Sequence, residues 1–190
     1  MEPVRPFLSL YNPINLAYRD KMLEQDYISY HQQNSIKHIR IAMPIAIILY
    51  TAFAWLDYIL FPEIAVSFIK IRLFIVAPFL ILVIINTFID TKGKYLQLLT
   101  SLSVLVGGFG VLGMLYIGGE KIFGLYYVGI ALIFFFNYDF LKLRFLPATI
   151  VGFILLLSYL LLALVYDVSN EVLVSSLFFL VSTNIMGSIS

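Results

Sequence analysis

Six stretches of 17 to 22 consecutive, mostly apolar residues occupy most of this 190-residue chain. A helix needs about 20 apolar residues to cross a bilayer, whereas a membrane β-strand needs about ten residues of alternating polarity. The six stretches are apolar on all faces and are separated by short polar turns. We therefore expect an all-α membrane protein, a six-helix bundle with transmembrane spans at about residues 41–60, 71–89, 98–117, 125–141, 145–166 and 172–190.

The composition excludes several other classes of protein. Hydrophobic residues make up 62% of the chain and charged residues 12%, about half the share that is usual in soluble proteins. A soluble globule of this size could not bury so much apolar surface. The absence of cysteine excludes disulfide bonds and zinc–thiolate sites. A net charge of +1 gives no reason to expect nucleic acid as a partner, so the partner we expect is the lipid bilayer.

The distribution of Lys and Arg predicts how the six spans are oriented. Basic residues are enriched in the cytoplasmic loops of membrane proteins. If the N-terminus is cytoplasmic, nine basic residues lie on the inner side and three on the outer side, namely Lys70, Arg72 and Lys121. We therefore expect a multi-pass protein of the cell inner membrane with both termini in the cytoplasm. The outer loops have ten residues or fewer, which leaves no room for an extracellular receptor domain.

Residues 1–40 are expected to form a cytoplasmic N-terminal segment that precedes a transmembrane domain over residues 41–190. Asn12-Pro13 is typical of a helix start, which predicts a helix over residues 14–40. Apolar residues at helical spacing form a stripe on this helix: Leu16, Leu23, Tyr27 and Tyr30. The helix would either lie on the inner membrane surface or pack on a partner or on a cytoplasmic continuation of the chain.

The sixth span carries a small-residue seam with a period of 3.5, which consists of Ser176, Leu180, Thr183, Gly187 and Ser190. This period is typical of a left-handed helix pair, and small residues allow helix backbones to approach closely in lipid. The seam therefore either packs within the bundle or forms a homodimer contact that continues as a cytoplasmic coiled coil. No basic residue or polar tail follows this span, so we expect the natural chain to continue into a cytoplasmic domain.

Few ionisable side chains fall near the predicted spans. Asp57 lies near the outer end of the first span, and its natural partner is Arg72 or Lys70 at the start of the second. Asp139 lies at the inner end of the fourth span, close to Arg144. We expect both acidic residues to form interfacial ion pairs, with a ligand-facing or proton-sensing role as the alternative for Asp57. No charged residue lies near the middle of a span, which disfavours an ion-coupled transporter.

The sequence contains no recognisable catalytic or cofactor-binding constellation. His31 and His38 share a helix face but have no third metal ligand at a suitable spacing. The glycine-rich run at residues 107–110 lies in mid-membrane and does not form a phosphate-binding loop. No nucleophile–base or acid–base pair is present. We therefore predict no catalytic, cofactor-binding or metal-binding residue within these 190 residues.

The layout resembles a known family of membrane domains. Asp57, the turn Phe61-Pro62-Glu63 and Arg72 carry the first part of the resemblance. The second part consists of the stretch from Tyr138 to Phe145 and the end of the chain, Leu177-Phe178-Phe179-Leu180 followed by Asn184-Ile185-Met186-Gly187. Together these features resemble the six-helix membrane domain that precedes the catalytic domain of bacterial class III adenylate/guanylate cyclases. Similar domains precede diguanylate cyclase and histidine kinase modules.

The resemblance implies a membrane anchor, dimerisation and sensor or regulatory domain of a cytoplasmic signalling enzyme. In that family the last span continues into a helical transducer that pairs the two catalytic domains of a homodimer. Mg²⁺ or Mn²⁺ would then be bound in a catalytic domain outside these residues. The alternatives are the membrane domain of a diguanylate cyclase or histidine kinase, a small transporter, and a stand-alone membrane scaffold.

The predicted topology can be tested with reporter fusions. Green fluorescent protein fused after Ser190 should fluoresce, because it becomes fluorescent in the cytoplasm. Alkaline phosphatase fused there should be inactive, because it becomes active only on the outer side of the membrane. The same two reporters fused after Pro62 serve as the control and should give the reverse result. An active phosphatase after Ser190 would contradict the predicted orientation and the cytoplasmic effector together.

Overall fold

The computed structural model describes residues 18, 20–90, 93, 95–141 and 143–189, and these residues form helices joined by short turns, without a β-strand. Two of the helices, η2 and η3, are π-helices. In chain order the helices are α1 (Lys21–Leu60), α2 (Ala65–Lys70), η2 (Ile71–Val76), α3 (Ala77–Ile89), α4 (Leu96–Gly118), α5 (Glu120–Phe135), η3 (Phe136–Phe140), α6 (Phe145–Val165) and α7 (Asn170–Ile189).

Six helical rods among the described residues are long and apolar enough to cross a membrane, as the sequence predicts. In two of these rods, shorter elements join end to end: α2, η2 and α3 form one, and α5 and η3 form another. Large apolar side chains are exposed along the flanks of the bundle, among them Ile48, Phe74, Leu157 and Phe178. A surface of this kind is suited to lipid and not to water. The helix lengths and the surface composition are therefore those of a multi-pass membrane protein.

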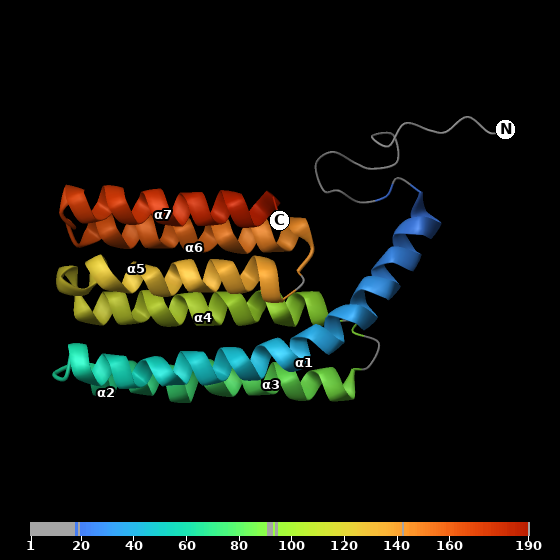
Figure 1. Cartoon of the computed structure of the whole chain (residues 1–190), viewed down its shortest axis with the longest axis horizontal. Coiled ribbons are helices and arrows are strands. Elements are labelled where there is room, and N and C mark those ends of the chain that lie inside the picture. Colours follow the sequence, from blue (N-terminus) through green and yellow to red (C-terminus); the bar gives the residue numbers. More distant parts are fainter. Residues whose placement is uncertain (1–17, 19, 91–92, 94, 142, 190) are drawn as a thin grey trace.

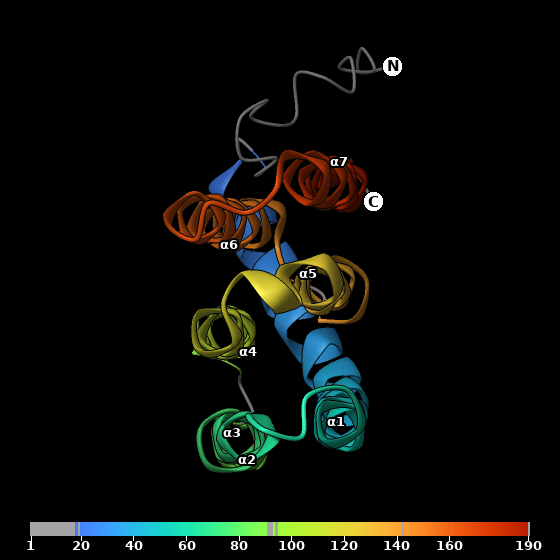
Figure 2. The same ribbon diagram turned by 90° about the vertical axis from the view of Figure 1, so that its left-hand side faces the viewer.

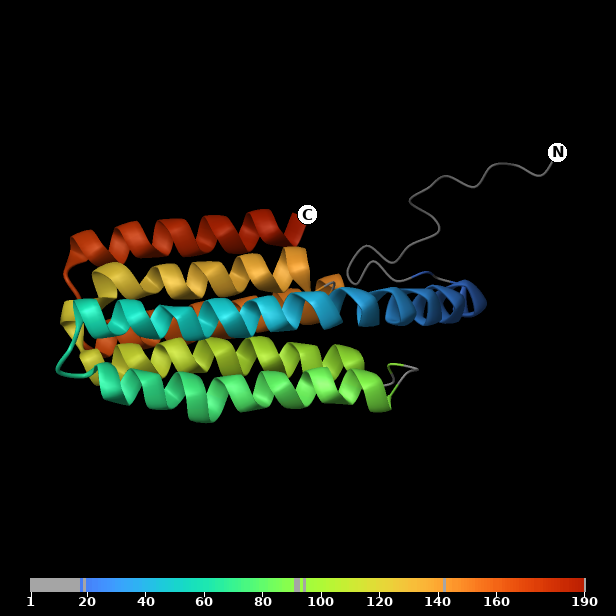
Figure 3. The same ribbon diagram turned by 60° about the horizontal axis from the view of Figure 1, so that its bottom comes forward.

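The rods lie side by side, and α4 is the most buried of them. Viewed along the bundle (Figure 2), α3, α4 and α6 lie on one side, and α1, α5 and α7 lie on the other. The last turn of α7 and the N-terminal half of α1 lie toward the same end of the bundle (Figures 1 and 3). The turn between α1 and α2 lies at the opposite end.

The first span and the helix expected before it form one continuous helix. Asp20 is the N-cap of α1, its carboxylate accepts a hydrogen bond from the amide of Met22 at 2.9 Å, and the helix continues for 40 residues. The boundary expected between residues 40 and 41 is therefore not a break in the backbone. The N-terminal turns of α1 extend beyond the other helices (Figure 1).

The apolar stripe predicted on this N-terminal half is exposed where the structure describes it, at Leu23, Tyr27 and Tyr30. Leu16, the first residue of the stripe, and residues 14–17 of the predicted helix lie outside the described residues.

Glycine allows α1 and η2 to pack closely against α4. A Cβ atom on Gly110 would lie 2.6 Å from the Tyr50 hydroxyl and 2.7 Å from Val76 Cγ2. Three residues further along α4, a Cβ atom on Gly113 would meet only Ile71 Cδ1, at an ordinary distance of 3.7 Å. The close packing therefore leaves no space for a side chain at Gly110, whereas it leaves space for a methyl group at Gly113 on the same helix.

We predict that Gly110→Ala destabilises the protein and that Gly113→Ala does not. The added methyl group at residue 110 forces α4 away from Tyr50 and Val76, and such overpacking costs about 1–3 kcal/mol. Thermal unfolding of the purified variants in detergent, followed by circular dichroism, measures the difference. Equal melting temperatures for the two variants would contradict the close contact at Gly110.

Candidate functional site

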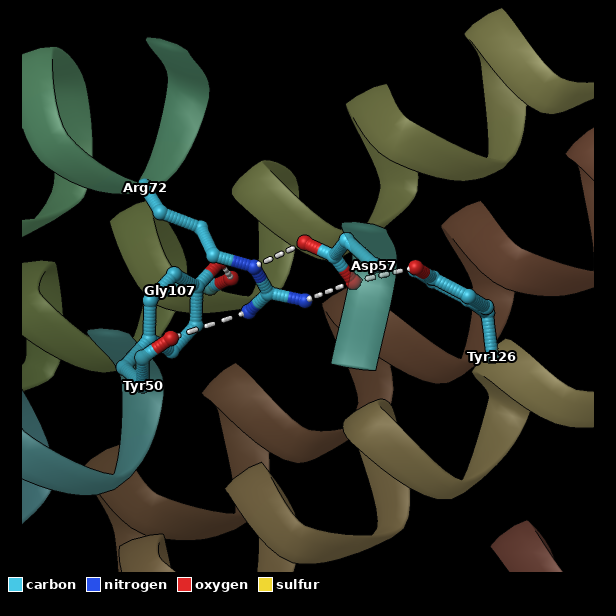
Figure 4. Close-up of polar contacts among 5 residues, drawn as sticks. All are labelled: Tyr50, Asp57, Arg72, Gly107 and Tyr126. Carbon is cyan, nitrogen blue, oxygen red and sulfur yellow. Dashed lines mark hydrogen bonds and ion pairs between the residues drawn. The ribbon is translucent and has the colours of Figure 1, made fainter. Parts of the chain in front are cut away.

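A buried ion pair joins α1 to the π-helix η2 (Figure 4). Arg72 Nε donates to Asp57 Oδ2 at 2.7 Å, and Arg72 Nη2 donates to Asp57 Oδ1 at 3.0 Å. The two side chains are only 5% and 1% exposed. The structure contains the pair that the sequence predicts, and it buries both side chains inside the bundle, one turn before the end of α1. Its two-point geometry is that of the strongest carboxylate–guanidinium pairs.

The π-helix η2 ends two residues before Pro78. Pro78 has no amide hydrogen, and its ring would clash with the carbonyl group four residues earlier in a regular α-helix. The preceding turn is widened, so that the amide of Ala77 donates to the carbonyl of Arg72, five residues earlier. Such widened turns are frequent at functional sites. Arg72 is therefore presented from an irregular turn, where the side-chain direction departs from that of a regular helix.

Tyr50 of α1 holds the guanidinium group from a second side. Its backbone carbonyl accepts a hydrogen bond from Arg72 Nη1 at 3.2 Å. The guanidinium carbon lies 4.9 Å from the centre of the Tyr50 ring and 5.7 Å from that of Phe53, within the range of cation–π attraction. The Tyr50 hydroxyl donates to the carbonyl of Gly107 on α4 at 3.1 Å (Figure 4). Arg72 is thereby connected to α4 as well as to α1.

Tyr126 brings α5 into the same group. Its hydroxyl donates to Asp57 Oδ1, the oxygen that also accepts from Arg72 Nη2 (Figure 4). Its ring packs against Phe61 and Phe68, with centroid distances of 5.7 and 5.3 Å. We call Tyr50, Asp57, Arg72 and Tyr126 the ionic cluster. It joins four of the helical rods at the end of the bundle where α1 meets α2.

A cavity of about 390 Å³ extends from the ionic cluster along α5, and all four cluster residues line it. The α4 side of the cavity includes Val104 and Gly107, and the far end is formed by Phe136 and Phe140 of η3. Its rim consists of exposed apolar residues of α1 and α5, namely Leu49, Leu56, Leu132 and Phe135. The cavity therefore opens on the flank between α1 and α5. Its volume lies within the range of about 300–1,000 Å³ typical of small-molecule sites.

A second polar contact lies at the other end of the bundle. The hydroxyl of Tyr138 in η3 donates to Asn184 Oδ1 of α7 at 2.7 Å. A Cβ atom on Gly152 would lie 2.7 Å from the Tyr138 hydroxyl, and a Cβ atom on Gly187 would clash with the Tyr138 ring. The two glycines leave the space between α6 and α7 in which Tyr138 lies. We call Tyr138 and Asn184 the tyrosine–asparagine contact.

The small-residue seam of the sixth span is used inside the chain. Ser176 and Leu180 are fully buried, and Gly187 packs against Tyr138. Thr183 is half-buried and donates to the carbonyl of Phe179, while Ser190 lies outside the described residues. Ser176, Leu180 and Gly187 therefore pack within the chain, where α7 lies against α5 and α6.

Arg144 pairs with a residue that the sequence pattern does not suggest. Its Nη2 lies 2.5 Å from Glu24 Oε1 on the N-terminal half of α1, and its amide donates to Gln97 Oε1. Because this guanidinium turns toward Glu24, the predicted pair with Asp139 does not form. Within the described ranges Asp139 has no ion pair. The pair of Arg144 is partly exposed, at 29% and 17%.

The sequence predicts the pair of Asp57 and Arg72 but neither tyrosine of the ionic cluster. One indication was available for Tyr50, since Tyr50, Phe53 and Asp57 recur at steps of three and four and so share a helix face. Tyr126 carries no comparable indication. In the part of the chain that the structure describes, no three His, Asp or Glu residues gather as metal ligands.

The chain matches no family model, no curated protein and no solved structure.

We predict that Arg72→Met alone destabilises the protein more than the double change Asp57→Leu with Arg72→Met. The single change leaves a buried carboxylate without its cation, which costs about 3–5 kcal/mol, whereas removal of both charges is often nearly neutral. Thermal unfolding in detergent measures both.

Arg144→Met is the matched control for this experiment, because it breaks the partly exposed pair with Glu24. Such a pair contributes about 1 kcal/mol or less. If the effects of Asp57→Leu and Arg72→Met simply add, the two side chains do not stabilise the protein as a pair.

Proposed function

We propose that this chain is the membrane-embedded sensor and regulatory domain of a cytoplasmic signalling enzyme, with a class III adenylate or guanylate cyclase as the first candidate. The observation that carries the proposal is the ionic cluster at the end of a cavity that opens on the lipid-facing flank. Charged groups buried among membrane spans are costly and usually serve a function. A cluster that joins four rods is a place where a bound molecule would change how the helices pack.

The route from the cavity to the last helix runs along α5 and η3. Tyr126 of α5 belongs to the ionic cluster, and Phe136 of η3 lines the far end of the cavity. Two residues later, Tyr138 contacts Asn184 of α7. In the proposed mechanism, a molecule in the cavity favours one of two positions of α5, and the tyrosine–asparagine contact passes this choice to α7. Helix α7 then acts on the effector domain.

The proposal places both termini on the cytoplasmic side of the cell inner membrane and pairs two copies of the chain as a homodimer. The buried part of the small-residue seam is occupied within one chain, so the contact between copies would use the outer face of α7. Exposed apolar residues recur on that face at a period of 3.5: Val174, Phe178, Val181 and Ile185. Mg²⁺ or Mn²⁺ would be bound in the catalytic domain of the effector.

We predict that Gly187→Leu changes the effector output of the full natural protein in isolated membranes. The larger side chain displaces Tyr138 and so alters the position of α7. A change of about fivefold or more is expected, as for typical couplings between sites. The assay measures cyclic AMP and cyclic GMP first, then cyclic diguanylate and autophosphorylation.

Met186→Leu is the control for this variant, because Met186 is exposed on the same helix. It should leave the output unchanged. Equal output from Gly187→Leu and the wild type, with insertion intact, would contradict the coupling through α7. A natural gene without an effector domain after α7 would contradict the proposed function itself.

A further inference from the structure

We propose that the cavity binds an uncharged, single-chain amphiphile that enters from the bilayer, with its oxygen atom at Arg72 and its chain along α4 and α5. The inference rests on the proposed function only in giving this ligand a regulatory role. The binding site itself follows from the unused donors of Arg72, the charge balance of the ionic cluster and the shape of the cavity.

Arg72 has hydrogen-bonding capacity that its protein partners do not use. A guanidinium group carries five N–H donors. Among the described residues, three of these donors are accepted, two by Asp57 and one by the carbonyl of Tyr50, and the Tyr126 hydroxyl also lies against the guanidinium. The group is only 5% exposed, yet it lines the cavity. Buried donors are normally satisfied. A ligand with an acceptor oxygen at this end of the cavity would satisfy the remaining N–H groups.

The charge balance of the ionic cluster selects an uncharged ligand. Asp57 neutralises Arg72 at hydrogen-bond distance, so the polar end of the cavity has no net charge. An anionic headgroup at Arg72 would lie beside the Asp57 carboxylate, and a cationic one at Asp57 would lie beside the guanidinium. Like charges so close together in a low-dielectric site repel strongly. A hydroxyl or carbonyl oxygen adds a hydrogen bond without disturbing the pair.

The rest of the cavity suits one hydrocarbon chain. Its lining on α5 extends from Leu125 to Phe135 and continues to Phe136, and ten residues of helix correspond to about 15 Å. A Cβ atom on Gly107 would meet only Ile133 Cδ1, at 3.9 Å, so this glycine leaves part of the cavity open. The volume of about 390 Å³ is near the lower limit for small-molecule sites, which favours one chain over a whole phospholipid.

The exposed apolar rim indicates that the ligand comes from the bilayer. Leu49 and Leu56 on α1, and Leu132 and Phe135 on α5, are 41–54% exposed and lie on the flank that faces lipid. A molecule already dissolved in the bilayer reaches such an opening without crossing water. The neutral hydroxyl or carbonyl group and the single chain together define the class of ligand.

The test uses the full natural chain in phosphatidylcholine nanodiscs and a dodecanol that carries a diazirine in its chain. After irradiation, peptide mass spectrometry should locate the label on cavity residues such as Gly107 and Leu132. The competitors are 1-dodecanol, dodecane, dodecanesulfonate and dodecyltrimethylammonium, each at a small mole fraction of the lipid. We expect 1-dodecanol to compete about tenfold better than the others, which corresponds to one added hydrogen bond.

Gly107→Leu should abolish the labelling, because its side chain fills the cavity. Gly113→Leu adds the same bulk to α4 outside the cavity lining and should label like the wild type. Leu132→Trp, at the exposed rim, closes the opening from α5 and provides a second variant that does not depend on how α4 accepts a larger residue. Labelling that persists in both Gly107→Leu and Leu132→Trp would overturn the proposal.

Equal competition by dodecane would also overturn it, because the polar end would then play no part. The chain has no cysteine, so Leu132→Cys allows disulfide trapping of two copies across this flank. Efficient trapping without labelling would assign the opening to a dimer contact.

The proposed function is judged separately by effector output. Specific labelling with no change in output refutes the regulatory role alone, and a Gly187→Leu effect without labelling refutes the ligand alone.

Discussion

The ion pair between Asp57 and Arg72 is the constraint on which the packing of α1, η2 and α5 depends. Either charge alone would be costly inside the bundle, and each is compensated by the other and by the tyrosines around them. Lipid offers no replacement hydrogen bonds, so helices joined in this way cannot drift apart gradually. They can only exchange one satisfied set of contacts for another. The pair therefore gives the bundle few stable arrangements instead of a continuum.

The cavity is a consequence of how these contacts are distributed. Tyr126 and Asp57 hold α5 and α1 together at one end, while Gly107 contributes no side chain to the space between them. The polar end of the cavity is thereby rigid, and its apolar length can be filled. A site with one polar end and an apolar length binds the polar end of a molecule by hydrogen bonds and the apolar remainder by shape complementarity.

Sequence alone was sufficient for the six spans, because crossing a bilayer requires long apolar helices whatever their partners. It was less reliable where a charge could be buried. Arg72 is predicted at the start of the second span; it lies inside the bundle, seven residues after the rod begins at Ala65, where Asp57 compensates its charge. Tyr126 is 69 residues from Asp57, and Glu24 is 120 residues from Arg144. Such contacts depend on the packing of distant helices, which local spacing does not encode.

The packing of distant helices also determines which neighbours the small residues of α7 contact. Small residues at a period of 3.5 permit a close neighbour but do not say which neighbour. Here Gly187 accommodates Tyr138, and Asn184 accepts its hydrogen bond, so α7 is held in register with the end of the rod that also carries Tyr126. The rod formed by α5 and η3 contributes to the ionic cluster, the cavity and the tyrosine–asparagine contact. A displacement of this rod at the ionic cluster therefore also moves Tyr138, unless η3 deforms. In the proposed mechanism, the widened turn of η3 therefore determines how much of a displacement of α5 reaches α7.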